Sequence, residues 1–302
     1  MHRLWKTIVS PLINEIKPKH IVEVGSEYGY TTKELLKYCN ENDAKLTSID
    51  PNPLFDVDEL KNRYGSKFEM LKGLSLDKLP LVKDYDMILL DGDHNWYTIY
   101  HELKLIEKEF ADNEFPLAVL HDISWPYARR DLYYNPDTIP EEFLNPYAKK
   151  GICPDKNELL ENGGLNSDLY NALEENTPKN GVLTGIEDFL NETDLELTFK
   201  VVNAFHGLGI LYPKNPKIDG IISEILSKND IPAILEKHYI KEIIALHAYY
   251  MGEIKKYADV IEQKDEIIDG LNYEINQRDQ KIARMEVEII RRDQQISKLT
   301  KK

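Results

Sequence analysis

Two acids and a histidine follow one short apolar run. In "YDMILLDGDHNWY", residues 85–97, the apolar run ends at Leu90 and is followed by Asp91, Asp93 and His94. Charged groups are costly to remove from water unless they are paired. A carboxylate can hold a divalent metal ion, and a histidine, whose ordinary pKa is near neutrality, can take a proton from a reacting hydroxyl. The pattern indicates a metal-assisted site or, alternatively, aspartates that cap a helix beside a surface histidine.

The elements that must position these residues alternate along the chain. Short apolar runs predict strands at 20–25, 45–50, 67–73, 86–91 and 117–122, and the apolar spacing between them predicts helices at 31–42 and 96–110. Such alternation is typical of an α/β fold, a Rossmann-like doubly wound sheet with helices on both faces. A helix at 181–193 and two strands within 195–213 follow, so we expect a terminal antiparallel strand.

The predicted strand ends bring acidic residues to one edge. In parallel sheets ligands bind beyond the carboxyl ends of the strands, and that edge holds Gly25, Asp50, Asp91 and Asp122. Asp91 and Asp122 end neighbouring strands, and two like charges repel unless a cation joins them. Carboxylate oxygens suit Mg²⁺, so the sequence predicts a divalent metal there.

The first strand leads into a glycine-containing turn. In "EVGSEYGYTT", residues 23–32, Gly25 and Gly29 allow a tight turn and close approach of a ligand. Asp50 ends the second strand, where a carboxylate can bind ribose hydroxyls. The G-x-x-x-G spacing is not the dinucleotide pattern G-x-G-x-x-G, and it suits a nucleoside without phosphates, such as S-adenosylmethionine. Ordinary strand–helix turns are the alternative.

These segments together resemble a known family. The stretches "VEVGSEYGYTT", "SIDP", "ILLDGDH" and "VLHDISWP" are similar to motifs of class I S-adenosylmethionine-dependent methyltransferases. The branch that they most resemble is the metal-dependent sugar O-methyltransferases similar to macrocin O-methyltransferase, with the related cephalosporin-hydroxylase-like proteins. The resemblance covers residues 15–215. It implies transfer of a methyl group from S-adenosylmethionine to a hydroxyl of a sugar or glycan-type acceptor.

The resemblance also implies roles for the residues of this edge. Asp91 and Asp122 match the metal ligands, whereas His121 stands where relatives usually carry a carboxylate. An imidazole ligand would favour Mn²⁺ or Fe²⁺ over Mg²⁺, and the alternative is that His121 is not a ligand. His94 matches the catalytic base, with capping of the following helix as the alternative. The implied cofactor site comprises Glu23, Gly25, Ser26, Gly29, Asp50 and Ser75, in which Glu23 holds the methionine part and Ser75 contacts the adenine.

A long segment rich in proline, tyrosine and asparagine interrupts the pattern at about 123–180. Its length predicts either a functional lid or a disordered segment, and its many aromatic residues favour an ordered lid. Trp125, Tyr127, Arg129 and Arg130 begin it, and aromatic faces and guanidinium groups suit sugars and acidic substituents. We expect them to contact substrate, with packing of the lid on its own domain as the alternative.

The C-terminal part has a seven-residue period. Isoleucine occupies position a of seven consecutive heptads, from Ile254 to Ile296, which predicts a coiled coil over residues 251–302 and a homo-oligomer. A single solvated helix is the alternative. The expected organisation is a methyltransferase domain at 1–216, a helical connector at 217–250 and the coiled coil.

Composition limits the remaining possibilities. The net charge of −15 argues against a nucleic-acid partner, because binding the phosphate backbone relies on basic residues. Two cysteines cannot form a disulfide framework or a zinc cluster. The N-terminal segment is typical of an amphipathic helix rather than a signal peptide, and no apolar stretch is long enough to cross a membrane, so we expect a cytoplasmic protein. Two other functions stay open: a coiled-coil scaffold with a methyltransferase-fold head, and an oxidative metal enzyme on the same fold.

Overall fold

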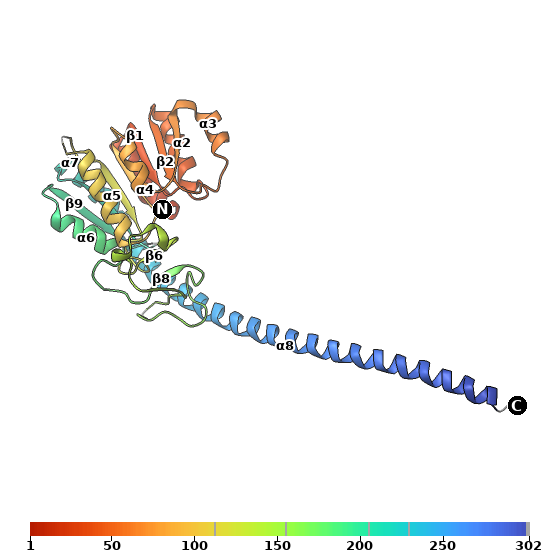
Figure 1. Cartoon of the computed structure of the whole chain (residues 1–302). Coiled ribbons are helices and arrows are strands. Elements are labelled where there is room, and N and C mark those ends of the chain that lie inside the picture. The colour runs from red at the N-terminus through yellow and green to blue at the C-terminus, as the bar shows by residue number, and fades with distance from the viewer. Residues whose placement is uncertain (112, 155, 205, 229, 300–302) are drawn as a thin grey trace. The chain divides into compact units, whose positions relative to one another are not determined.

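The structure is a computed structural model that describes residues 1–299 except 112, 155, 205 and 229 (Figure 1). The side chains of residues 2, 230–242 and 298–299 are also outside the described part. The chain divides into two units, Met1–Tyr249 and Tyr250–Lys302. Among the described helices, none combines the length and apolar character that crossing a bilayer requires.

A mixed sheet of seven strands forms the centre of the first unit. Its strands are β1 (His20–Val24), β2 (Lys45–Asp50), β3 (Phe68–Lys72), β4 (Met87–Leu90), β5 (Leu117–His121), β9 (Leu197–Val202) and β10 (Leu208–Pro213). The order is β3-β2-β1-β4-β5-β10-β9, in which the first five strands are parallel and β10 is antiparallel to both neighbours. The predicted Rossmann-like fold is therefore confirmed, and the antiparallel strand that comes last in the chain lies one place inside the sheet edge.

Helices cover both faces of this sheet. One face carries α1 (Ser10–Ile16), α2 (Tyr30–Asn42), α3 (Val57–Tyr64) and α7 (Pro216–Ser227), and the other carries α5 (Trp96–Glu109), α6 (Val182–Glu192) and α4 (Ser75–Lys78), which packs beside α5. Each face of the sheet packs against its helices in a hydrophobic core. Alternate residues of β1 point into the two cores: Ile21 packs in the core with α1, α2, α3 and α7, the first core, and Val22 and Val24 pack in the second core, with α5 and α6. Both faces of β1 and β4 are buried, and β4 is accordingly wholly apolar, whereas β1 also buries His20 and Glu23.

Short helical turns complete the first unit. They are η1 (His2–Leu4), η2 (Trp5–Val9), η3 (Gly65–Lys67), η4 (Leu79–Leu81), η5 (Pro136–Thr138) and η6 (Glu141–Phe143). The predicted N-terminal amphipathic helix is made of three pieces, η1, η2 and α1. Its apolar residues pack in the first core, with Ile8 and Leu12 each 1% exposed.

The strand register places the predicted site residues side by side. Leu90 of β4 lies opposite Leu120 of β5, so Asp91 and His121 come next on adjacent strands. Val24 of β1 lies opposite Leu90, so Gly25 follows the end of β1 beside Asp91.

The segment after β5 is ordered around one buried carboxylate. It contains a small antiparallel sheet in the order β6-β8-β7, made of β6 (Leu132–Tyr133), β8 (Tyr170–Ala172) and β7 (Tyr147–Lys149). Asp131, which is 1% exposed, accepts hydrogen bonds from the backbone N–H groups of Trp96 and Gly181 and from Tyr133 Oη and Asn145 Nδ2. This carboxylate joins distant parts of the segment to the start of α5.

Helix α8 (Asp230–Leu299) includes all described residues of the second unit. From Ile254 to Ser297 its side chains are exposed, and Glu253 before them is partly buried. The long C-terminal helix is confirmed, and the coiled coil stays a prediction.

Candidate functional site

Two aspartates and two histidines meet at the carboxyl edge of β4 and β5. His121 Nδ1 lies 3.0 Å from Asp91 Oδ1 and 2.7 Å from Asp122 Oδ2, and His94 Nδ1 lies 3.2 Å from Asp122 Oδ2. Asp122 adopts a left-handed backbone conformation with φ of 59° directly after β5. Helix α5 is capped by Asn95, whose Oδ1 accepts the Thr98 N–H, so capping does not explain the aspartates.

Positive charges balance the aspartates in this cluster. Burial alone would raise the pKa of Asp91, but His121 and the Met1 α-ammonium, 2.6 Å from Asp91 Oδ2, outweigh it and lower that pKa. Burial would lower the pKa of His121, but Asp91 and Asp122 raise it to about 10. The repulsion between the two acids is thus relieved here by an imidazolium and an ammonium.

The same cluster has the donors for a metal ion. One ligand atom each from Asp91, His121 and Asp122 lies within 4.8 Å of the others. Two carboxylates and an imidazole suit a divalent transition metal. Because a metal ligand must be deprotonated, His121 would have to lose its proton for such an ion to bind.

The glycine turn after β1 lies against this cluster. Gly25 has a φ of +83°, and a Cβ at this position would collide with the backbone carbonyl oxygen of Asp91. Gly29 has a φ of +72°, and its Cβ would lie 2.8 Å from the ring of Phe55. Both positions therefore require glycine, and the first of them joins the turn to the acid cluster.

Asp50 holds this turn in place. Its Oδ2 accepts hydrogen bonds from Ser26 N at 2.7 Å, Ser26 Oγ at 3.0 Å and Glu27 N at 2.9 Å, and its Oδ1 accepts one from Asn52 N at 2.7 Å. A carboxylate oxygen can accept two hydrogen bonds, so Oδ1 has capacity for a further donor. Asp50 thus has a structural role in addition to the predicted ligand contact.

Glu23 in β1 has a buried carboxyl group, and only one of its two oxygens accepts hydrogen bonds among the described residues. Its Oε2 accepts hydrogen bonds from Thr32 Oγ1 and Ser48 Oγ, both at 2.7 Å, while Oε1 is buried with no hydrogen-bond partner among the described residues. Burial raises the pKa of Glu23 to about 7. A buried acceptor without a donor is costly, which makes Oε1 a candidate contact for a donor group of a ligand.

A second buried carboxyl, Glu102 of α5, was missed by the sequence analysis. Glu102 is 2% exposed and accepts a hydrogen bond from the side chain of Ser75, the predicted adenine contact at the start of α4. Its Oε1 is buried without a partner in the described part of the chain. Burial raises the pKa of Glu102 to about 8. A signal existed in the sequence, because Glu102 falls in the apolar stripe of Ile99, Leu103 and Ile106.

Aromatic rings surround His94. The buried ring of Tyr127 stacks on His94 with centroids 5.9 Å apart and planes at 4°, and its hydroxyl is held by Asn166 and Asn171. Tyr134 was not singled out from the sequence. Its ring centroid lies 5.7 Å from that of His94, and the residue is 51% exposed. Trp125 packs with Tyr127 and its neighbours in a small core of the segment.

The two arginines of this segment have partners of their own. Arg129 forms a bidentate ion pair with Glu187, at 2.5 and 2.7 Å. Arg130 is 1% exposed, and its guanidinium donates to the carbonyl oxygens of Ala172 and Asn157. Arg129 thus joins the segment to α6, and Arg130 packs the segment onto itself, so a direct contact with substrate would require them to exchange these partners.

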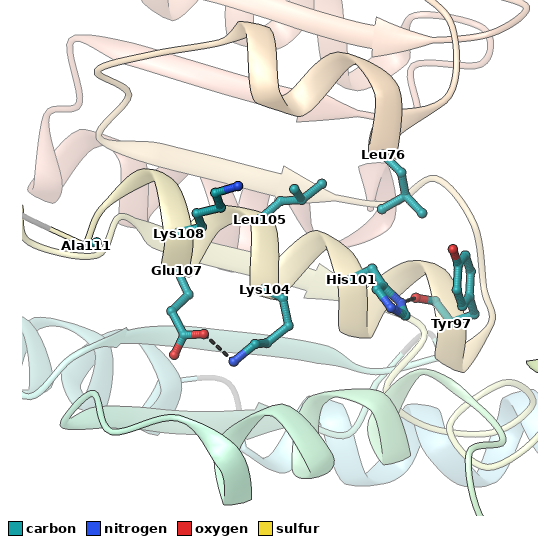
Figure 2. A pocket seen from close by; sticks show the side chains of 8 residues that line it. All are labelled: Leu76, Tyr97, His101, Lys104, Leu105, Glu107, Lys108 and Ala111. Atoms are coloured by element: carbon teal, nitrogen blue, oxygen red, sulfur yellow. Dashed lines mark hydrogen bonds and ion pairs between the residues drawn. The ribbon is translucent and has the colours of Figure 1, made fainter.

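A surface groove of about 590 Å³ runs along α5 (Figure 2). It is lined by Leu76, Tyr97, His101, Lys104, Leu105, Glu107, Lys108 and Ala111. Figure 2 shows Leu76 and Tyr97 at one end and Ala111 at the other, with Lys104 paired to Glu107 between them. The groove begins next to Ser75 and is separate from the acid–histidine cluster.

Comparison with known families identifies the part of the chain that holds this cluster. Residues 22–123 match the family model described as "Methyltransferase domain". This third of the chain is similar to a methyltransferase domain. The matched span runs from β1 through β5 and includes Glu23, Gly25, Asp91, His94 and Asp122. The predicted enzyme class, a methyltransferase, agrees with this domain.

Individual relatives are distant. A polyamine aminopropyltransferase of Oceanobacillus iheyensis is 28% identical over 100 residues, which cover 32% of this chain and 19% of that protein, so the match spans about a fifth of that relative. Among solved structures, the Podospora anserina methyltransferase PaMTH1 bound to S-adenosylhomocysteine is 14% identical with a TM-score of 0.41, over 68% of this chain and 77% of that one. The Burkholderia thailandensis 1,6-didemethyltoxoflavin-N1-methyltransferase is 12% identical with a TM-score of 0.40, over 68% and 76%.

Proposed function

We propose that this protein is a metal-dependent O-methyltransferase that transfers a methyl group from S-adenosylmethionine to a hydroxyl of a sugar or glycan-type acceptor. The observation that carries the proposal is the contact between Gly25 and the backbone of Asp91. It joins the turn expected to hold the cofactor to the acids and histidine expected to carry out the reaction, at one edge of the sheet.

The residues of the first turn fit the cofactor. Glu23 Oε1 is a buried acceptor with no partner among the described residues, and it suits the α-ammonium of the methionine part. Asp50 Oδ1 has capacity for a ribose hydroxyl. Ser75, held by Glu102, is proposed to contact the adenine. Glycine at position 25 allows the turn to lie directly against the backbone of Asp91.

The acid cluster fits a divalent ion. Asp91, His121 and Asp122 would hold it, and the imidazole favours Mn²⁺ or Fe²⁺, whereas the carboxylates also accept Mg²⁺. When bound, the ion supplies a Lewis acid that orients and acidifies the acceptor hydroxyl.

His94 is proposed to take the proton from that hydroxyl. Its Nδ1 faces Asp122 Oδ2, so the neutral ring with a proton on Nδ1 keeps the lone pair on Nε2 for use as a base. In the reaction the hydroxyl oxygen forms a bond to the methyl carbon. The bond from that carbon to the sulfonium sulfur breaks, its electron pair stays on sulfur, and the hydroxyl proton moves to His94.

The aromatic rings support a sugar acceptor. Tyr134 exposes about half of its side chain beside His94, and the ring of Tyr127 stacks on the histidine from another direction. Aromatic faces pack well against the apolar faces of sugar rings, while the hydroxyls stay available for hydrogen bonds and reaction.

Binding and turnover together test the proposal. Calorimetry should show S-adenosylmethionine binding, and labelled methyl donor with a panel of nucleotide sugars and glycan fragments should give a methylated product that requires a divalent ion. Absence of cofactor binding would overturn the proposal in favour of a scaffold. Iron-dependent oxidation of a substrate, with spectral changes of the iron-loaded protein, would favour the oxidative alternative that His121 keeps open.

A further inference from the structure

Helix α8 exposes an apolar stripe along the second unit. The stripe consists of Ile254, Ile261, Ile268, Ile275, Ile282, Ile289 and Ile296, and each of these side chains is between 51% and 59% exposed. A contiguous exposed apolar surface on a soluble protein marks an interaction site. Its seven-residue period matches a facing helix with the same period.

Basic residues interrupt the stripe in a regular way. The d position of alternate heptads is basic, and the next residue, at e, is aspartate. These pairs are Lys264–Asp265, Arg278–Asp279 and Arg292–Asp293. A charge in a buried layer is costly unless an opposite charge meets it. In a parallel coiled coil the d residue of one helix packs beside the d and e residues of the other, so each basic side chain would meet an aspartate of its partner.

The helix itself supplies a second acid for two of these arginines. Arg278 lies 3.9 Å from Glu274, and Arg292 lies 2.6 Å from Glu288. Both glutamates occupy position g, which faces position e of the neighbouring helix in a parallel pair. Each arginine would then lie between a glutamate of its own helix and an aspartate of the second copy, which removes the repulsion between those two acids.

Other arrangements lose this pairing. An antiparallel pair sets e against e, and this would bring Asp265, Asp279 and Asp293 toward acidic neighbours. A parallel pair shifted by one heptad sets the Arg278 of one copy beside Leu271 and Asn272, where no acid meets it, and only the other Arg278 beside an acid, Glu286. A shift of fourteen residues would keep this kind of pairing but leave one basic residue of each copy outside it, so the charge pattern favours parallel chains without a shift, in which all three pairs form.

We propose that residues 254–297 bind a second copy of this chain as a parallel, in-register coiled coil, with Arg278 and Arg292 each held between Glu274 or Glu288 of one helix and Asp279 or Asp293 of the other. This inference concerns α8 alone and does not depend on the proposed methyl transfer, because its test measures mass and cross-linking rather than activity.

Charge reversal in the full chain tests the pairing. Two double variants are compared with the wild type by light scattering. One carries Arg278→Asp and Arg292→Asp, and the other carries Asp279→Arg and Asp293→Arg. Each should lower the measured mass from a multiple of 35.1 kDa to that of one chain. Mixing the two variants should restore the assembly. The matched control, Arg284→Asp with Arg291→Asp, changes the same charges at the outer position c and should keep the wild-type mass. A wild-type protein with the mass of one chain, or an assembly that both reversals leave intact, would overturn the proposal.

A cross-link tests the orientation. In a Cys153→Ser background, Ile289→Cys at position a should form a disulfide between two copies on mild oxidation, because the same residues face each other in a parallel pair. Gln294→Cys, on the outer face, is the matched control and should remain largely monomeric on a non-reducing gel. An assembly in which Ile289→Cys fails to cross-link is antiparallel or shifted and contradicts the proposal.

Discussion

His94 and Asp122 come from different strand ends and face each other with 3.2 Å between Nδ1 and Oδ2. Asp122 also lies 2.7 Å from His121, so one carboxylate connects the proposed base to the proposed metal ligands. A single carboxylate thus orients one histidine and balances the charge of the other.

Replacement of the base is the first test of this arrangement. His94→Gln should lower kcat by about 10²–10⁴-fold, the usual contribution of a general base, with a much smaller effect on the KM for S-adenosylmethionine. The measurement is steady-state kinetics with labelled methyl donor. The matched control is His101→Gln, which should retain the wild-type kcat. His101 lies on α5, and its Nδ1 is hydrogen-bonded to the Tyr97 carbonyl oxygen. Equal losses in both variants would argue against a specific role for His94.

Asp91 should be needed for metal rather than for the cofactor. Asp91→Asn removes a charged ligand atom, so metal-stimulated turnover should be lost while the affinity for S-adenosylmethionine, measured by calorimetry, is nearly unchanged. Asp93→Asn, the same change two residues later and outside the cluster, should keep metal stimulation. Full wild-type activity in EDTA would contradict the metal role.

Glu23 should recognise the amino-acid part of the cofactor. Glu23→Gln replaces a carboxylate by an amide, so the affinity for S-adenosylhomocysteine should fall about tenfold or more, as expected for a lost charged hydrogen bond of about 1.4 kcal/mol or more. Binding of 5′-methylthioadenosine, which lacks the amino-acid part, should not change. A similar loss for both ligands would indicate a general disturbance of β1 instead.

Glu102 should make stability depend on pH. Its pKa is raised from 4.5 to about 8 by burial, with Ser75 and the charge of Asp93 as further influences. The unfolded state therefore releases this proton at lower pH than the folded state, and stability is lost as pH rises from about 4.5 to 8. Glu102→Gln has no proton to release here and does not lose this stability. The free energy of unfolding of Glu102→Gln minus that of the wild type should therefore increase between pH 4.5 and 8 by a few kcal/mol, since one pKa unit corresponds to about 1.4 kcal/mol.

Urea unfolding of the wild type and Glu102→Gln at several pH values measures this difference. Glu107→Gln, on the outer side of α5, is the matched control. A difference between Glu102→Gln and wild type that stays constant from pH 5 to 8 would show that Glu102 is ionised in the folded state.

The sequence was sufficient for the elements that depend on local patterns. The strand at Met87–Leu90 was found because it is a short, wholly apolar run before polar residues, and the glycines at 25 and 29 were found because a turn between strand and helix requires them. Asp91, His121 and Asp122 were expected at one edge because parallel strands end together, and they do lie together there.

Features that depend on distant partners were not predictable in this way. Arg130 was expected to face a substrate, but its buried contacts are carbonyl groups of residues 157 and 172, which no local pattern connects to it. The role of Asp131 likewise depends on backbone groups at 96 and 181. The contact of the Met1 α-ammonium with Asp91, 2.6 Å from Oδ2, joins residues 90 positions apart and likewise has no local signal.

Under the proposed function, a divalent ion binds between the ends of β4 and β5 beside the cofactor. Crystals grown with S-adenosylhomocysteine and Mn²⁺, measured near the manganese absorption edge, test it directly. We expect one strong anomalous peak within coordination distance of Asp91 and Asp122, with the sulfur of the ligand on the same side of the sheet. A bound ligand with no anomalous peak at these two aspartates would contradict it.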